Sequence, residues 1–267
     1  MSIRLIVSDC DGTALDDQKK LDAGLKEVLP VLRELGIEFT FATGRNMEIV
    51  MPMVKELDLH LPIITNGGAE IYDGERYLVK HAIVHSELKR IIEWLEKHQI
   101  RSVYYSNDCL YTRYADEVNE YFLKRMQGKV AVKSLDDVTR LEAMDLFKIV
   151  IIEPEDDLLT STAAFVNTLP QTHCLLAEDH LCTITHQRAS KGNALKELIA
   201  YLGIDEEEVV VIGDNHNDCS MFEAFSNSVA MGNATDEIKK AVRIVTEDNN
   251  HQGVSKLLWR IVKGEVV

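Results

Sequence analysis

Short apolar runs alternate with amphipathic stretches over the first part of the chain. The runs RLIVS (4–8), IEFTFA (37–42) and PIITN (62–66) have the length and apolar character of buried strands. Apolar residues recur at helical spacing before Gly36, and a second helical stretch covers about 47–57. This β-α-β-α-β order with short connections predicts a parallel sheet with right-handed crossovers. Because proline disturbs a helix interior, we expect a kink or break at two positions, Pro30 and Pro52.

The pattern changes near residue 70. The stretch EIYDGERYLV predicts a hairpin around Asp73-Gly74. Beyond it, short strands mix with helices, which predicts a separate α+β module over roughly 82–187. The elements expected there are helix SELKRIIEWLEKHQ, strands SVYYS and CLYTR, helix ADEVNEYFLKRM, strand FKIVII, a helix over 155–168, and strands THCLLA and LCTIT.

The parallel pattern returns near Ser190. A helix, KGNALKELIAYLG, leads to the fully apolar strand EVVVIG, and the short strands SVAM and RIVT each precede a helix. We therefore expect an α/β fold in which residues 1–81 and 188–267 form one doubly wound parallel-sheet domain. Residues 82–187 are expected to form an inserted α+β domain.

Composition narrows the classes of partner. The chain has 267 residues, 46% of them hydrophobic, which is enough for a substantial core. A formal net charge of −15 argues against nucleic acid or an anionic membrane as partner. No window approaches about eighteen apolar residues and no signal peptide is recognisable, so we expect a cytoplasmic protein without a membrane partner. The cysteines show no C-x-x-C spacing and are expected to be free thiols: Cys10, Cys109, Cys174, Cys182 and Cys219.

Two aspartates follow the first strand in the sequence SDCDGTALDD. Side chains alternate along a strand, so Asp9 and Asp11 are expected on one face and Cys10 on the other. Two carboxylates about 4 Å apart repel by roughly 4 kcal/mol at a near-surface dielectric, which suggests a bound cation. A calcium loop is excluded because its sixth and twelfth positions hold Ala14 and Lys20.

Three further strand ends carry polar motifs: TGR (43–45), SKG (190–192) and GDNHND (213–218). The carboxyl ends of parallel strands meet at one edge of the sheet, so these motifs should converge with Asp9. Taken singly, each also has an ordinary interpretation: a turn, a solvated surface lysine, or a polar turn in which Asp218 caps a helix. Neither a Walker loop nor G-x-G-x-x-G follows the first strand, which argues against ATP and dinucleotides.

Together these residue types fit phosphoryl transfer. Asp9 would attack phosphorus to form an aspartyl-phosphate, and Asp11 would protonate the leaving oxygen and then activate water. Asp214 would share a hard cation such as Mg²⁺ with Asp9. Lys191 and Thr43 would stabilise charge on the transferring group.

The same motifs resemble those of a known family. DCDGTAL, TGR, SKGNAL and GDNHNDCSMF are similar to the four motifs of the haloacid dehalogenase superfamily, most closely its Cof-type phosphatases; NGGAEIYD, VAMGNA and NNHQGV also resemble family stretches. The resemblance implies a Rossmann-like core with an inserted α/β cap and Mg²⁺ as cofactor. The roles it implies are Asp9 as nucleophile, Asp11 as acid/base and backbone-carbonyl metal ligand, Thr43, Gly44, Lys191 and Asn217 as phosphate contacts, Asp9 and Asp214 as metal ligands, and Asp218 as part of the metal site or support for the lysine.

The function expected is magnesium-dependent hydrolysis of a small phosphorylated metabolite, such as a sugar phosphate or a phosphorylated cofactor. A sugar phosphomutase would use the same aspartyl-phosphate, and a non-catalytic ligand-binding relative would keep only the fold. The inserted domain is expected to select the substrate, because a module that closes over a site excludes water and contacts the rest of the ligand. We expect a monomer or a small homo-oligomer.

Overall fold

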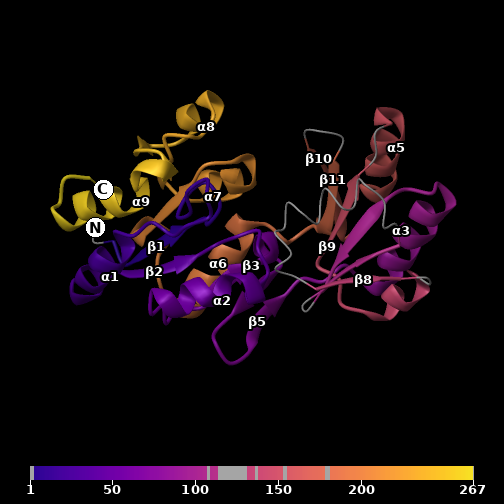
Figure 1. Cartoon of the computed structure of the whole chain (residues 1–267), viewed down its shortest axis with the longest axis horizontal. Helices are drawn as coiled ribbons and strands as arrows, with labels where there is room; N and C mark the ends of the chain where they lie inside the picture. The colour runs from indigo at the N-terminus through magenta and orange to yellow at the C-terminus, as the bar shows by residue number, and fades with distance from the viewer. Residues whose placement is uncertain are drawn as a thin grey trace. The chain divides into compact units, whose positions relative to one another are not determined.

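The chain folds into two compact units, which we call unit 1 and unit 2 and describe separately (Figure 1). Unit 1 comprises Met1–Asn46, Val50–Lys80 and Ser190–Val267, and unit 2 comprises Met47–Ile49 and His81–Ala189. This computed structural model describes residues 3–106, 109–113, 131–135, 138–152, 155–177 and 181–266.

Unit 1 is built on a five-stranded parallel sheet in the order β14-β13-β12-β1-β2. The central strand, β1, pairs in parallel with β12 on one side and β2 on the other. The prediction of an α/β fold with a doubly wound parallel sheet is confirmed. The strands are β1 (Leu5–Ser8), β2 (Glu38–Phe41), β12 (Val209–Gly213), β13 (Asn227–Ala230) and β14 (Ile244–Val245).

Helices cover this sheet because its strands are apolar on both faces. Leu5 and Val7 of β1 share a core with the buried faces of α6 and α7, whereas α1 packs against β2 and α9. The helices of unit 1 are α1 (Leu25–Glu34), α2 (Met47–Glu56, whose first turn belongs to unit 2), α6 (Lys191–Leu202), α7 (Cys219–Ala224), α8 (Asp236–Ala241) and α9 (Gly253–Val262). Short 3₁₀ turns are η1 (Asn66–Gly68), η3 (Glu206–Glu208), η4 (His216–Asp218) and η5 (Asn249–His251).

The third predicted strand exists, but its place in the sheet was predicted wrongly. β3 (Ile63–Thr65) forms an antiparallel sheet with β4 (Glu70–Tyr72) and β5 (Tyr77–Lys80). It lies beside β2, through an isolated parallel bridge from Ile64 to Ala42 and a hydrogen bond from the Thr40 hydroxyl to the Pro62 carbonyl. The reason is local: η1 reverses the chain directly after β3, so β4 pairs back on it. The hairpin between β4 and β5 is confirmed, and the Asp73 carboxylate accepts two backbone N–H groups in its turn.

The helices α1 and α2 continue through Pro30 and Pro52, so neither proline breaks its helix, and the expected kink stays a prediction. A proline inside a helix removes one hydrogen bond, at a cost of about 3 kcal/mol. Burial of one apolar helix face offsets that loss, since each buried aliphatic side chain contributes roughly 1.5 to 3 kcal/mol. In α1 the buried residues are Leu25, Val28, Leu29 and Leu32.

Unit 2 is a six-stranded mixed sheet in the order β10-β11-β9-β6-β7-β8, in which only β7 and β8 pair in parallel. The helices α3 (His85–Lys97) and α5 (Asp156–Val166) share a hydrophobic core with one face of the sheet. The strands are β6 (Ser102–Tyr105), β7 (Cys109–Thr112), β8 (Ala131–Ser134), β9 (Lys148–Ile152), β10 (Thr172–Ala177) and β11 (Leu181–His186), with a 3₁₀ segment η2 (Val138–Ala143). The expected helix ADEVNEYFLKRM lies outside the described residues.

The expectation that every cysteine is a free thiol was wrong for two of them. Cys174 of β10 and Cys182 of β11 form a disulfide, with their Cα atoms 6.6 Å apart. The two cysteines are diagonal neighbours on these antiparallel strands, because Cys174 lies opposite Ile184 and Cys182 lies opposite Leu176. Cys10, Cys109 and Cys219 are free. Among the described residues, none of the helices has the length and apolar character needed to cross a membrane.

Candidate active site

Asp9 lies at the carboxyl end of β1, directly after Ser8, and is almost fully buried. Its backbone N–H continues the sheet ladder by donating to the carbonyl of Ile212 in the neighbouring strand, at 2.9 Å. Its carboxylate accepts a hydrogen bond from the Lys191 ammonium, with 2.7 Å between Nζ and Oδ1. The central strand therefore places a carboxylate next to a cation at the sheet edge where parallel-sheet proteins bind ligands.

Lys191 is the first residue of α6, and only 1% of it is exposed, so the alternative of a solvated surface lysine is wrong. Ser190 caps the helix, because its hydroxyl accepts the N–H of Asn193. The Lys191 ammonium lies between two carboxylates, 2.7 Å from Asp9 Oδ1 and 2.5 Å from Asp218 Oδ1. Burial tends to lower the pKa of Lys191, but the charges of these carboxylates outweigh it and raise the pKa.

Asp218 is fully buried and orders the loop after β12. One carboxylate oxygen, Oδ2, accepts the backbone N–H groups of Asp214 and Asn215, at 3.0 and 3.1 Å, while Oδ1 accepts from Lys191. Asp218 is the N-cap residue of α7, as in the ordinary interpretation of this motif, but its carboxylate makes no capping hydrogen bond to that helix. Asp218 instead connects the loop that carries Asp214 to the lysine of α6.

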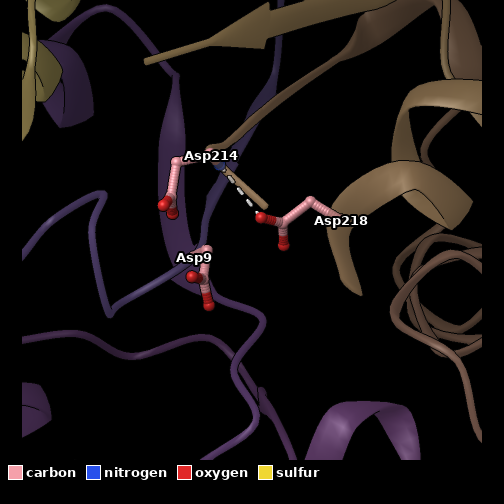
Figure 2. Close-up of side chains that lie close together, drawn as sticks. All are labelled: Asp9, Asp214 and Asp218. Atoms are coloured by element: carbon pink, nitrogen blue, oxygen red, sulfur yellow. Dashed lines mark hydrogen bonds between the residues drawn. The ribbon is translucent and has the colours of Figure 1, made fainter. Parts of the chain in front are cut away.

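Three carboxylates from two strand ends and the following turn gather at this point: Asp9, Asp214 and Asp218 (Figure 2). Each offers an oxygen within 4.8 Å of the oxygens of the others. Burial is the largest cause that raises the pKa of Asp9 to about 7 and that of Asp214 to about 6. Their charged forms thus have less stabilisation than they would have in water, and a hard divalent cation with oxygen ligands fits this donor set.

Asp11 lies outside this group of carboxylates. Its carboxylate forms a bidentate pair with Arg45, at 2.6 Å for both contacts, and accepts from the Lys19 ammonium at 2.9 Å. Burial alone would raise the pKa of Asp11, but the hydrogen bonds from Arg45 and Lys19 outweigh it and lower the pKa to about 2. A single bound cation was expected to reduce the repulsion between Asp9 and Asp11. For the Asp11 side chain this expectation was wrong, because Arg45 and Lys19 neutralise its charge. The metal ligand that the resemblance implies at Asp11 is its backbone carbonyl.

Thr43 and Gly44 follow β2. Thr43 is buried, and its hydroxyl accepts the N–H of Arg45 at 3.2 Å. The turn η1 holds this segment, since Asn66 and Gly67 donate their N–H groups to the carbonyls of Arg45 and Thr43. Gly44 is exposed, and a Cβ at this position would meet open space. The segment thus has a fixed backbone with free space beside it.

Asn217 is exposed within η4, one residue before Asp218. Direct hydrogen bonds join Lys191 to Asp9 and Asp218, and Asp218 in turn to the backbone of Asp214. Among the contacts described for unit 1, none ties Asn217 or Gly44 to these residues.

Two glycines allow this close packing. Gly12 has a φ of +75°, and a Cβ there would lie 2.4 Å from Asp214 Oδ2. Gly68 has a φ of +99°, and a Cβ there would lie 2.2 Å from the backbone oxygen of Ser190, at the start of α6. Any larger residue would displace the segments that carry Asp214 and Lys191.

The sequence reasoning missed four residues that contact the site. Arg45 and Thr13 stand inside quoted motifs but received no role, because their partners, Asp11 and Asp214, lie in other segments of the chain. Asn233 lies within the quoted stretch VAMGNA, and its contact with Asp214 depends on a loop 19 residues away. Nothing in the sequence marks Lys19, an ordinary lysine in a polar segment.

The fold and the strand-end aspartates define the class to which this protein belongs. A family model of haloacid dehalogenase-like hydrolases matches residues 6–258, so the chain belongs to this family. The prediction of a Cof-type phosphatase of this family, an enzyme of the phosphoric monoester hydrolase class, is confirmed.

Particular relatives match almost the whole chain. The chain is 28% identical to the 5-amino-6-(5-phospho-D-ribitylamino)uracil phosphatase YwtE of Bacillus subtilis, covering 98% of this chain and 99% of the relative. It is also 28% identical to the pyridoxal phosphate phosphatase YbhA of Escherichia coli, covering 97% and 98%. A solved haloacid dehalogenase-like hydrolase from B. subtilis is 26% identical and superimposes with a TM-score of 0.83, covering 96% of this chain and 99% of that one.

Proposed function

We propose that this protein is a magnesium-dependent phosphatase of small phosphorylated metabolites that acts through a phosphorylated Asp9. The observation that carries the proposal is the buried Lys191, held between Asp9 and Asp218 beside the third carboxylate, Asp214. A nucleophilic carboxylate, an adjacent fixed cation and a set of oxygen ligands are the parts that phosphoryl transfer needs. The relatives named as phosphatases support the same reaction class.

In the first step, an Asp9 carboxylate oxygen bonds to phosphorus as the ester P–O bond breaks. Asp11 gives its proton to the departing oxygen, which leaves as an alcohol. In the second step, water attacks phosphorus, Asp11 takes up the proton, and the bond between Asp9 and phosphorus breaks to release phosphate. Atoms and charge balance because Asp11 ends protonated, as it began.

The ion pairs of Asp11 bear on both steps. Arg45 and Lys19 hold its carboxylate in the ionised form, which suits the step in which it takes a proton from water. To donate a proton, Asp11 must first leave Arg45 and become protonated. We therefore infer that Arg45 holds the ionised Asp11 in place after the first step, until Asp11 takes the proton from water in the second step.

The remaining residues bind and orient the phosphoryl group. Lys191 neutralises Asp9 and lies close enough to share its charge with an attached phosphate. Thr43 offers a hydroxyl, and the Gly44 amide and the Asn217 side chain lie in exposed segments that a phosphate can approach. The inserted residues 82–187 would select the substrate.

Magnesium would be held by the carboxylates of Asp9 and Asp214, by the Asp11 backbone carbonyl, and with support from Asp218. When bound, it would supply positive charge that reduces the repulsion between an anionic nucleophile and an anionic phosphate.

The test is phosphate release from a panel of phosphorylated sugars, nucleotides and cofactors, with magnesium and with a chelator. The panel includes pyridoxal 5′-phosphate and 5-amino-6-(5-phospho-D-ribitylamino)uracil, the substrates in the names of the two relatives. Asp9→Asn, which keeps the shape of the side chain, is the matched blank. Magnesium-dependent release by the wild-type protein alone would support the proposal. Release that the blank or the chelator leaves undiminished would refute it.

A further inference from the structure

The Asp214 carboxylate has a hydrogen-bond donor on each oxygen. The Thr13 hydroxyl donates to Oδ1 at 2.8 Å, and the Asn233 amide nitrogen donates to Oδ2 at 3.3 Å. The same Asn233 nitrogen donates to the carbonyl of Gly12 at 2.9 Å. Asn233 thus joins the loop after β1 to the carboxylate after β12, two segments about 200 residues apart in sequence.

The orientation of the Asn233 amide is fixed from its other side. Its Oδ1 accepts the backbone N–H of Asn249 at 3.2 Å. Asn249 is itself buried, and its side-chain nitrogen donates to the Leu15 carbonyl at 3.1 Å and to Asp17 Oδ1 at 3.0 Å. With an N–H donor on one side and two acceptors on the other, the amide of Asn233 has only one orientation that satisfies every group.

We propose that Asn233 is a positioning residue for the metal ligand Asp214: it holds the carboxylate in its ligating orientation and so sets the affinity for Mg²⁺. This inference rests on the proposed function. A donor on each oxygen limits rotation of the carboxylate and leaves the other lone pairs for the cation. Removing such a partner of a metal ligand weakens metal affinity by about 10- to 100-fold.

Two substitutions at position 233 distinguish a positioning role of the side chain from an effect of its charge on Mg²⁺ binding. Asn233→Leu removes both donor and acceptor with similar volume. Asn233→Asp keeps the shape but turns an acceptor toward Asp214 and the Gly12 carbonyl, while adding a negative charge near the site. If charge alone governed the site, the aspartate would strengthen Mg²⁺ binding; positioning requires that it weaken binding.

Asn233 is exposed, so its replacement leaves the hydrophobic core intact. Asn250 is the control: it is also an exposed asparagine whose side chain joins two loops. Its amide oxygen accepts the backbone N–H of Asp17 and its amide nitrogen donates to Asp17 Oδ2, whereas the hydrogen bonds to Asp214 come from Thr13 and Asn233. Asn250→Leu therefore measures the effect of losing a loop contact alone.

The experiment is calorimetric titration of Mg²⁺ into each protein without substrate, together with the Mg²⁺ dependence of phosphate release. We expect about 10- to 100-fold weaker binding for both Asn233 variants, wild-type affinity for Asn250→Leu, and lost activity that rises again at high Mg²⁺. Thermal unfolding without Mg²⁺ verifies that each variant is folded, and Asn233→Asp tests the proposal if Asn233→Leu fails to fold.

Wild-type affinity in either folded Asn233 variant would overturn the positioning role while the proposed function stood. Equal weakening in Asn250→Leu would also overturn it, since the effect would then belong to the loop. If the wild-type protein itself binds no Mg²⁺, the proposed function fails and this inference fails with it.

Discussion

Replacing Lys191 by methionine should destabilise unit 1 strongly. Methionine keeps most of the volume of lysine but leaves Asp9 and Asp218 without the cation that lies 2.7 and 2.5 Å away. Removing one partner of a buried ion pair typically costs about 3 to 5 kcal/mol, because the other charge stays buried and uncompensated. Since burial already raises the pKa of Asp9 to about 7, this carboxyl can take up a proton when the lysine is lost. We therefore expect Lys191→Met to lower the free energy of unfolding by about 3 kcal/mol, the lower end of this range.

The assay is thermal unfolding followed by circular dichroism, in a chelator so that no metal replaces the lost charge. A loss of about 3 kcal/mol would lower the midpoint of thermal unfolding by about 6 to 12 °C for a chain of this size. Asp218→Asn combined with Lys191→Met should cost less than the sum of the single changes, because the two residues interact directly.

The control is Lys196→Met in the same helix. Lys196 lies 3.8 Å from Glu206, both side chains are about half exposed, and exposed pairs contribute about 0 to 1 kcal/mol. If Lys191→Met is no more destabilising than Lys196→Met, the reasoning from buried charge is refuted. Additive effects of Lys191→Met and Asp218→Asn would equally contradict it.

Three further outcomes follow. Asp9→Asn should fold normally and lower turnover by at least about 10³-fold in steady-state assays, and retention of wild-type turnover would remove Asp9 as nucleophile. Asp11→Asn should lower kcat by about 10²- to 10⁴-fold without abolishing Mg²⁺ binding in calorimetry, and an undiminished kcat would argue against its acid/base role. Alkylation under denaturing, non-reducing conditions should label three cysteines, and five only after reduction; labelling of all five at once would contradict the bond between Cys174 and Cys182.

The parallel sheet was predictable because its signal is local. Apolar runs such as that of β1 and β12 identify strands buried on both faces, and the intervening helical stretches fix their direction. Once the strands are parallel, their carboxyl ends must meet at one edge. The convergence of Asp9 and Asp214 therefore followed from the order of elements, without any knowledge of contacts. Lys191 begins α6, and the strand before it, β11, belongs to the sheet of unit 2, so the same argument does not place it.

The partner of each charged group was not predictable in this way. The sequence contains 29 lysines and arginines, and nothing local identifies Arg45 as the cation that binds Asp11 or Lys191 as a fully buried one. An ion pair between distant segments forms only if both loops place their side chains within about an ångström of the right position. The loops take up these positions only when the whole unit is packed. For the same reason, the register that places Cys174 opposite Ile184, and so two residues from Cys182, could not be inferred from cysteine spacing.

By itself, the sequence determined the class of fold, the edge of the sheet that carries the site and the acidic residues gathered there. It could do so because the apolar pattern of each strand and the order of the strands depend only on residues that are neighbours in the chain. Tertiary structure alone decided that β3 joins an antiparallel sheet, that Asp11 pairs with Arg45 instead of joining the carboxylate group, and that Asn233 contacts Asp214. These features depend on close contacts between segments far apart in the chain, and such contacts exist only once burial and backbone hydrogen bonding have fixed the position of every loop.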